Sequence, residues 1–189
     1  MMDQFLEEVV VKKNQGMQTV LLVLANIMMV LCALVGVIAL NILINALSGL
    51  FSGGGAGSLV FPAILLVVFG GTAVLLFLKR DELKTEYEYT FTNGILDFAK
   101  VFNNKKRKAL GTMNLKNIEA CGKVASGSFN RYITMPQIKR TNWFLNREAD
   151  LFYLYFTKDS QKRIIIIEPS QEMEELIRHA VQPGAYQQN

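Results

Sequence analysis

Charge is missing from a long part of the sequence. Between Gln18 and Leu78 there is no Lys, Arg, Asp, Glu or His, so every charged residue lies in the first 13 positions or from Lys79 onward. An uncharged, apolar stretch of this length is typical of segments that cross a lipid bilayer. The chain is therefore expected to combine a membrane part with a water-soluble part.

Cysteine and histidine are scarce, with two cysteines and one histidine in 189 residues. Cys32 falls in an apolar run and Cys121 in the soluble part, and their spacing suggests neither a metal site nor a disulfide, which fits a reducing, cytosolic setting. His179 lies in the last turn of a predicted helix, where it complements the helix dipole or is solvated. The sequence also has no nucleophile beside a base and no glycine-rich loop between a strand and a helix. We therefore expect a non-enzymatic protein without catalytic residues, cofactor or metal.

A large excess of one charge is also absent. The net charge is +4, and residues 81–189 hold 16 Lys or Arg against 13 Asp or Glu. This excess is too small for a dedicated nucleic-acid binder, so nucleic acid is not an expected partner.

Two apolar runs are long enough to cross a bilayer. The first, 19–47, has 29 residues and the second, 59–78, has 20. A span of about 20 residues covers about 30 Å of hydrocarbon at 1.5 Å per residue. Residues 48–58 between the runs form an uncharged connector rich in Gly and Ser. The sequence thus predicts an α-helical membrane hairpin.

Basic residues flank the hairpin on one side only. Lys12 and Lys13 precede the first span, Lys79 and Arg80 follow the second, and the connector has none. Positively charged flanks favour the cytoplasmic side. We therefore expect a multi-pass protein of the cell membrane with both termini cytoplasmic and the connector outside. A cleaved signal peptide is a poorer explanation of the first run, because the run exceeds an h-region and no cleavage site follows it.

Asn26 is a polar residue that lies deep in the first span. It is predicted to form a hydrogen bond with the other helix of its own hairpin, and a larger membrane assembly is the alternative. Gly70 and Gly71 in the second span, with Ala33 and Gly36 in the first, allow helices to approach closely. Packing within the hairpin explains them better than a homo- or hetero-oligomer, which stays open.

The juxtamembrane segment 1–18 begins with an amphipathic stretch. Residues 3–13 are predicted to form a short helix, whose apolar side contains Phe5, Leu6, Val9 and Val10. The helix is expected to lie in the cytoplasmic membrane interface as an anchor, or to extend into solvent or against the soluble domain.

Alternation of apolar and polar residues begins after the second span. Tyr87, Tyr89 and Phe91 share one face of a strand predicted at 84–92, and Asn93-Gly94 then predicts a tight type I′ turn. Further strands are predicted at 95–102, 105–113, 118–125, 151–157 and 163–168, with a short one around Trp143. The Ile164–Ile167 run indicates a strand that is buried on both faces.

The C-terminal end of the soluble part is predicted to be helical. Ser170 can cap a helix with an apolar side at every third or fourth residue, which ends before Pro183. Residues 183–189 are expected to form a flexible tail. The stretch 129–149 has no clear pattern.

About seven antiparallel strands followed by one amphipathic helix resemble the pleckstrin-homology (PH) fold, in which that helix caps an open barrel. The resemblance is carried by Tyr89 to Ile95, by Leu115 to Ile118 before the fourth strand, and by Ile167 to Ser170 at the start of the helix. These features are similar to the bacterial PH-like domains that follow one or two membrane helices in small proteins. The resemblance covers 84–182 and implies a mainly β, α+β cytoplasmic domain beside the membrane α-helical hairpin, without deciding its function.

One run of basic residues stands out, namely Lys105, Lys106, Arg107 and Lys108. It suits a soluble hairpin tip whose lysines protect a strand edge. The alternative is contact with anionic lipid headgroups, because a tether of three residues, 81–83, keeps the domain within about 10–15 Å of the bilayer. The loop that binds inositides in some PH domains is here a tight turn with Glu86 and Glu88 nearby, so specific inositide recognition is not expected.

A second basic group lies in the unassigned stretch and contains Arg131, Lys139, Arg140 and Arg147, together with the aromatic residues Tyr132, Trp143 and Phe144. Protein binding and the ordering of a loop around packed aromatics explain this group equally well. The sequence as a whole predicts a membrane-anchored scaffold or interaction module whose PH-like domain binds an unidentified protein. Sensing of anionic membrane lipids and membership of a larger membrane assembly are the alternatives.

Overall fold

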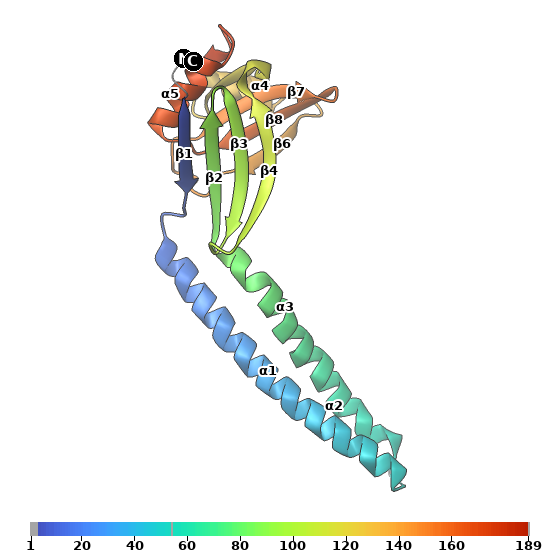
Figure 1. Ribbon diagram of the computed structural model, residues 1–189. Coiled ribbons are helices and arrows are strands. Elements are labelled where there is room, and N and C mark those ends of the chain that lie inside the picture. The colour runs from blue at the N-terminus through green and yellow to red at the C-terminus, as the bar shows by residue number, and fades with distance from the viewer. Residues whose placement is uncertain (1–3, 54, 189) are drawn as a thin grey trace. The chain divides into compact units, whose positions relative to one another are not determined.

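The computed structural model describes residues 4–53 and 55–188. The chain forms two compact units, one made of Asn14–Lys84 and the other of the residues up to Lys13 together with those from Thr85 onward. The first unit is a helical hairpin and the second is mainly β (Figure 1). The β unit is therefore discontinuous in sequence, because the hairpin is inserted between its first and second strands.

The helical unit contains two long apolar segments. α1 (Gln15–Phe51) is a continuous helix of 37 residues, whose Asn14 cap accepts a hydrogen bond from the Met17 backbone N–H. The second segment runs through η1 (Ala56–Leu59), α2 (Val60–Leu65), the π-helical η2 (Leu66–Gly70), α3 (Gly71–Lys79) and η3 (Arg80–Leu83). By length and composition, Gln15–Phe51 and Ala56–Leu83 are both able to cross a membrane.

Small residues line the contact between the two helical segments. Cys32, Ala39 and Ala73 are all buried in it. A Cβ atom on Gly36 would lie 3.5 Å from the Cα atom of Gly70, so the two backbones are almost in contact there. Close approach of this kind is typical of packed membrane helices, which lack a hydrophobic driving force between them.

Arg80 and Asn26 define the register at the other end of the hairpin. Arg80 Nη1 donates a hydrogen bond of 2.8 Å to Asn26 Oδ1, and the guanidinium lies 5.0 Å from the centre of the Phe77 ring. Because a helix rises 1.5 Å per residue, α1 begins about 16 Å before the level of Arg80. The two apolar segments therefore do not start and end together.

The first sheet of the β unit has the strand order β1-β2-β3-β4, with every neighbouring pair antiparallel. Its strands are β1 (Phe5–Val10), β2 (Thr85–Thr92), β3 (Ile95–Phe102) and β4 (Lys106–Asn114). Asn93 and Gly94 both have positive φ, at 48° and 86°, which is the geometry of the predicted type I′ turn. The buried side chains of β2 are Tyr87, Tyr89 and Phe91, as the alternation predicted.

The prediction of a helix at 3–13 was wrong, because Phe5–Val10 is a strand paired with β2. Leu6 and Val10 pack against the core, whereas Phe5 and Val9 are exposed, so the buried side chains alternate. The same four apolar residues fit one side of a helix. The strand forms because the edge of β2 supplies hydrogen-bond partners from a distant part of the chain.

The second sheet has the strand order β6-β8-β7-β5-β9. Its strands are β5 (Ala120–Lys123), β6 (Lys139–Trp143), β7 (Phe152–Lys158), β8 (Gln161–Ile167) and β9 (Tyr186–Gln187). β6 pairs with β8 and β5 with β9 in parallel, and the remaining pairs are antiparallel. The expected set of about seven antiparallel strands is thus corrected to two sheets of four and five strands. The additional strands β1 and β9 come from the two ends of the chain.

The tail 183–189 was expected to be free, yet part of it joins the second sheet. Gln187 is in register with Gly122 of β5, and the Cys121 N–H donates a 2.8 Å hydrogen bond to the Ala185 carbonyl. Ala185 itself is 5% exposed. Tyr186 and Gln187 pair here because β5 offers them a free edge, which local sequence does not reveal.

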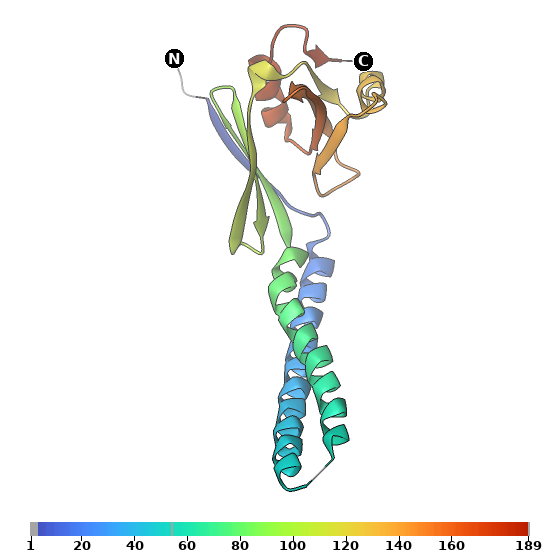
Figure 2. The ribbon, with the colours of Figure 1, turned by 90° about the vertical axis from the view of Figure 1, so that its right-hand side faces the viewer.

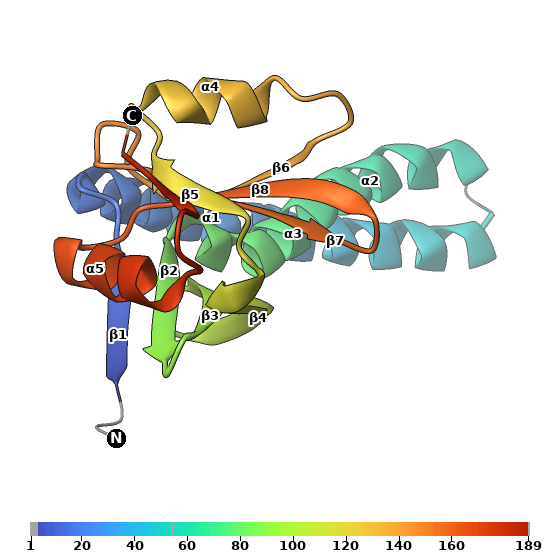
Figure 3. The ribbon, with the colours of Figure 1, turned by 90° about the horizontal axis from the view of Figure 1, so that it is seen from above.

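The two sheets face each other across the main core, and Figure 2 shows them side by side. Ile165 and Ile167 point into this core, whereas Ile164 and Ile166 point into a second cluster on the other side of the sheet, so β8 is buried on both faces as predicted. That second cluster includes Phe129 of α4 (Gly127–Ile133), which covers this outer face (Figure 3). Helix α4 begins just before the stretch 129–149, where the sequence showed no pattern.

Helix α5 (Gln171–Ala180) follows β8 and packs into the main core. Its buried side chains are Met173 and Ile177, which are fully enclosed. The Ser170 hydroxyl accepts a hydrogen bond of 3.2 Å from the Met173 N–H, so the predicted helix cap is present.

Candidate functional site

A cleft lies between the edge strand β4 and the inner face of the second sheet. It has a volume of about 320 Å³ and is lined by residues of β3, β4, β6, β7 and β8. Its apolar lining consists of Phe98, Leu110, Met113, Trp143, Phe156 and Ile165. A concave and mostly apolar cavity with a few polar groups is the usual form of a ligand-binding site.

Trp143, the only tryptophan of the chain, packs directly against β4. Its ring centre lies 4.7 Å from that of Phe98, and a Cβ atom on Gly111 would lie 4.0 Å from its Cη2 atom. The Tyr89 hydroxyl donates a hydrogen bond to the Trp143 backbone carbonyl. The indole ring therefore packs over Gly111 at a distance where a Cβ atom would make an ordinary van der Waals contact.

Arg163 lies at the positively charged side of the cleft. Alternation along β8 places it on the same face as Ile165 and Ile167. Its Nε atom is buried and has no hydrogen-bond partner within the described part of the chain, and its Nη2 atom lies 3.8 Å from Asp159 Oδ2. A buried donor without an acceptor costs about 1–3 kcal/mol, so the guanidinium has the capacity to bind a further acceptor.

Two lysines extend this positive charge. The Cα atoms of Lys139 on β6 and Phe156 on β7 are both in register with Arg163, so these three side chains share the inner face of the sheet. Lys158 lies two positions beyond Phe156 and also lines the cleft. An apolar cleft thus has Arg163 and Lys158 in its lining and Lys139 on the same face of the sheet.

The cleft is bordered by two strand edges. Among the described strands, β4 is the last in the first sheet and β6 the first in the second, so each pairs on one side only. The side chains of β4 are largely exposed. The free N–H and C=O groups of such an edge are able to pair with another chain.

The structure divides the predicted basic run between the two faces of β4. Arg107 Nε donates a hydrogen bond of 2.5 Å to Glu88 Oε2 on the outer face. Lys106 and Lys108 lie on the opposite face, where Lys108 is directly across from Lys100. Lys100 therefore belongs to the basic group, although it lies outside the run, and only the strand register reveals this.

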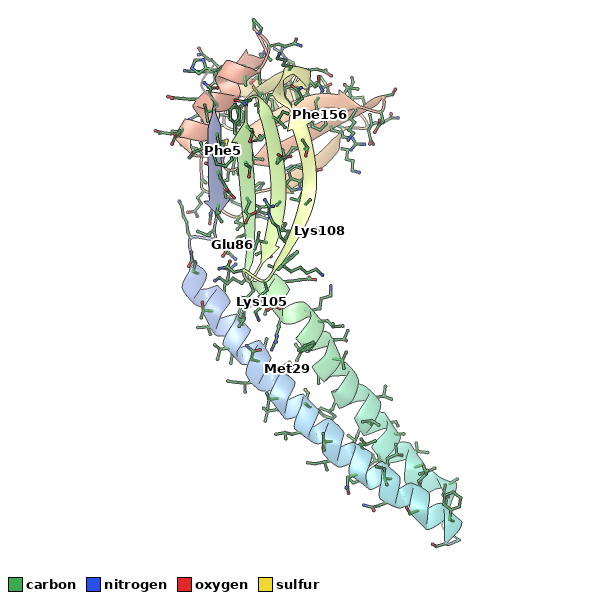
Figure 4. All side chains as sticks on the ribbon, viewed as in Figure 1. Phe5, Met29, Glu86, Lys105, Lys108 and Phe156 are labelled. Carbon is green, nitrogen blue, oxygen red and sulfur yellow. The ribbon has the colours of Figure 1, made fainter. Side chains whose placement is uncertain are left out.

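The basic group lies at the end of the first sheet to which the hairpin is joined in the chain. Thr85 at the start of β2 is in register with Phe102 at the end of β3, and Lys105 follows in the next turn. Figure 4 shows Lys105 and Glu86 at this end of the sheet. Val10 at the end of β1 is in register with Tyr87, so the chain leaves and re-enters the sheet at the same end.

The structure divides the second predicted basic group between the two faces of the second sheet. Arg131 is on α4, at the outer face of the second sheet, and Arg140 Nε donates a hydrogen bond of 3.0 Å to Asn142 Oδ1. Lys139 and Trp143 lie on the face of β6 that is directed toward the cleft. Sequence reasoning missed Arg163, which stands directly before the run Ile164–Ile167.

Polar contacts hold β1 in the β unit. Glu8 Oε2 accepts the Ser170 N–H at 3.0 Å, at the start of α5. Asn146 Oδ1 accepts the Lys13 N–H at 2.8 Å, and Asn146 Nδ2 donates to Glu168 Oε1 at 2.7 Å. Burial raises the pKa of Glu8 above its usual value, while the hydrogen bond from Ser170 acts in the opposite direction.

Within the described ranges 4–53 and 55–188, no group of three His, Cys, Asp or Glu side chains is placed so that it could bind a metal ion. Burial raises the pKa of Cys121 to about 12, which keeps this thiol protonated near neutral pH. The cleft, lined by apolar side chains together with Arg163 and Lys158, is the candidate site of the β unit.

The arrangement of two sheets with a helix after the last long strand agrees with the comparison to known families. A family model described as a bacterial PH-like domain (DUF6106) matches residues 2–186. The chain belongs to this family. The expected PH-like resemblance is thus confirmed, and the match extends over β1 and both apolar helical segments of the hairpin. No curated protein and no solved structure matches the chain.

Proposed function

We propose that this protein is a membrane-anchored, non-enzymatic interaction module. The hairpin holds it in the cell membrane, and the PH-like domain, capped by α5, binds a partner protein on the cytoplasmic side. One observation carries the proposal. In the most apolar 18 residues of Gln15–Phe51 only 17% are buried within the structure, and in those of Ala56–Leu83 only 6%. A core helix of a soluble protein is mostly buried, whereas the apolar side chains of a membrane helix are covered by lipid.

The register of the hairpin supports a specific placement of the membrane. Gly36 lies against Gly70, and Asn26 accepts a hydrogen bond from Arg80. Asn26 precedes Gly36 by as many residues as Arg80 follows Gly70, so both contacts belong to one antiparallel register. A layer of about 30 Å that covers 59–78 then covers the part of α1 from about residue 28 to Leu47. We place the cytoplasmic boundary of α1 near Asn26, because its amide is paired there with an arginine that ends the second span.

Fractionation of cells that express the full chain tests the anchor. We expect the protein in the membrane pellet after extraction at alkaline pH, with a C-terminal tag that antibodies reach only after the membrane is permeabilised. Chemical cross-linking in these cells should recover a partner protein with the chain. Release into the supernatant, or a tag accessible on intact cells, would contradict the proposal.

A second candidate function is contact with anionic lipid headgroups. It is favoured by the gathering of Lys100, Lys106 and Lys108 on one face, at the end of the sheet where the chain leads to and from the hairpin. Near an anionic leaflet each basic residue contributes up to about 1 kcal/mol. Arg107 contributes less, because its guanidinium is already paired with Glu88.

Hydrogen exchange of the full chain in vesicles tests this second function. Exchange at residues 102–108 should be slower in vesicles that contain phosphatidylglycerol than in phosphatidylcholine alone. Replacing Lys100, Lys106 and Lys108 by Gln should remove the difference, whereas Gln at the exposed Lys116 and Lys162 should not. Equal exchange in both kinds of vesicle would exclude lipid contact by this group.

A further inference from the structure

We propose that the cleft between β4 and β6 binds an extended acidic segment of a partner protein. The segment adds as a strand to the free edge of β4, places an apolar side chain against Trp143 and pairs a carboxylate with Arg163. This inference rests on the proposed function, because it names where the interaction module binds its partner and the chemistry that it recognises.

The edge of β4 is open to regular pairing from Gly111 onward, beyond the irregularity at Leu110 in its register with β3. The charged residues Lys106 to Lys108 protect the beginning of the strand from unwanted pairing. From Ala109 to Asn114 the strand has no charged side chain, and this is the part that borders the cleft. An extended peptide therefore finds unpaired backbone groups and the cleft in the same place, which is the arrangement used in recognition by strand addition.

The shape of the cleft suits the side chains of such a peptide. In a strand added to β4, every second side chain points toward the second sheet. These side chains would meet the apolar surface of Trp143, Phe156 and Ile165. At about 320 Å³ the cleft is at the lower end of the size range of ligand pockets, so it fits one or two peptide side chains better than a large cofactor.

The charge of the cleft selects an acidic partner. Lys139, Lys158 and Arg163 share the inner face of the second sheet, and Asp159 Oδ2 lies 3.8 Å from Arg163 Nη2, beyond hydrogen-bond distance. The buried Nε atom has no acceptor in the described structure. The side chain as a whole is 29% exposed although Nε is buried, so a partner carboxylate can accept from the terminal guanidinium nitrogens, and charge-assisted pairs of this kind are among the strongest hydrogen-bonded contacts.

Fluorescence of the full chain in phosphatidylcholine vesicles tests the proposal, since Trp143 is the only tryptophan and lies in the cleft. The probes are the peptides Ac-LTVTETD-NH2 and Ac-DTETVTL-NH2, because an added strand can run in either direction. One of them should shift the Trp143 emission to shorter wavelength in a saturable manner. The basic peptide Ac-LTVTKTK-NH2 should not bind, and methylation of alternate backbone amides of the active probe should abolish binding.

Two variants connect the binding to Arg163. Arg163→Gln should raise the Kd of the active probe about tenfold, the loss expected for one charge-assisted hydrogen bond. Lys162→Gln, on the adjacent and outward-facing position of β8, should change the Kd less than about twofold. The peptide controls use the unmodified protein, so they remain decisive even where Arg163→Gln affects folding.

Several results would overturn the inference. They are the absence of binding by both acidic probes, equal binding of the acidic and basic peptides, equal binding of the methylated probe, and an unchanged Kd in a folded Arg163→Gln protein. An emission shift caused by phosphatidylglycerol vesicles without peptide, and lost in Arg163→Gln, would assign the cleft to lipid instead. If neither acidic probe binds while a partner protein is still cross-linked to the unmodified chain in cells, the proposed function stands and only the cleft assignment fails.

Discussion

Replacement of Arg163 by methionine should make the protein more stable while it removes the binding capacity of the cleft. The buried Nε atom has no partner in the described structure, and its desolvation costs about 1–3 kcal/mol. The side chain is 29% exposed, so the lower end of this range applies. The ion pair with Asp159 is long and contributes less than about 1 kcal/mol. Methionine keeps the apolar stem against Phe156 and Ile165.

The net change expected for Arg163→Met is an increase of up to about 1 kcal/mol in the free energy of unfolding, which corresponds to a rise in Tm of no more than roughly 2–4 °C. Urea unfolding of the full chain in a neutral detergent, followed by Trp143 emission, measures it. Lys162→Met is the matched control, since it exchanges a cation on the exposed side of the same strand, and its effect should stay within about 0.5 kcal/mol. A loss of stability of more than about 1 kcal/mol in Arg163→Met would refute the reasoning, because the guanidinium would then be well bonded in the free protein.

Three further changes test other parts of the structure. Burial raises the pKa of Glu8 above 4.5, so the ionised carboxylate opposes folding. Glu8→Gln should therefore unfold at higher urea concentration than the unmodified protein at pH 7.5. The difference should vanish as the pH falls below about 4, because Glu8 is then protonated in both the folded and the unfolded protein. Gly122→Ala should lower Tm in a thermal scan by the equivalent of about 1–3 kcal/mol, because its Cβ would lie 2.6 Å from the Gln187 carbonyl oxygen and separate β9 from β5. Asn26→Leu removes the acceptor of Arg80 and should weaken the hairpin by about 0.6–2 kcal/mol, measured by circular dichroism in increasing sodium dodecyl sulfate.

Several strands could be predicted closely because their signals are local. The turn at Asn93-Gly94 requires residues that accept positive φ, and it fixes the strands on both sides of it. The run Ile164–Ile167 of β8 is buried on both faces, as a short apolar stretch between turns predicts for a central strand. By contrast, Lys139–Trp143 and α4 lie in a stretch without a pattern, since their partners are supplied by β8 and by the outer face of the second sheet.

The candidate site was only partly accessible to prediction. Lys139 and Trp143 were chosen for their charge and aromatic character, and both are on the cleft side of β6. Arg131 and Arg140, chosen on the same grounds, lie elsewhere. Arg163 was not chosen, because a single arginine at the start of a strand is ordinary until neighbouring strands show that its Nε atom is buried.

The sequence by itself determined the two apolar helical segments, the strands β2, β3, β7 and β8, and helix α5, because uncharged length, alternation, turn residues and helix caps act over a few neighbouring positions. Only the tertiary structure decided that Phe5–Val10 is a strand and that Arg80 lies level with Asn26. It also decided that an edge of one sheet meets the inner face of another to form a cleft. These features depend on groups that are far apart in the chain, and local patterning carries no information about which of them become neighbours.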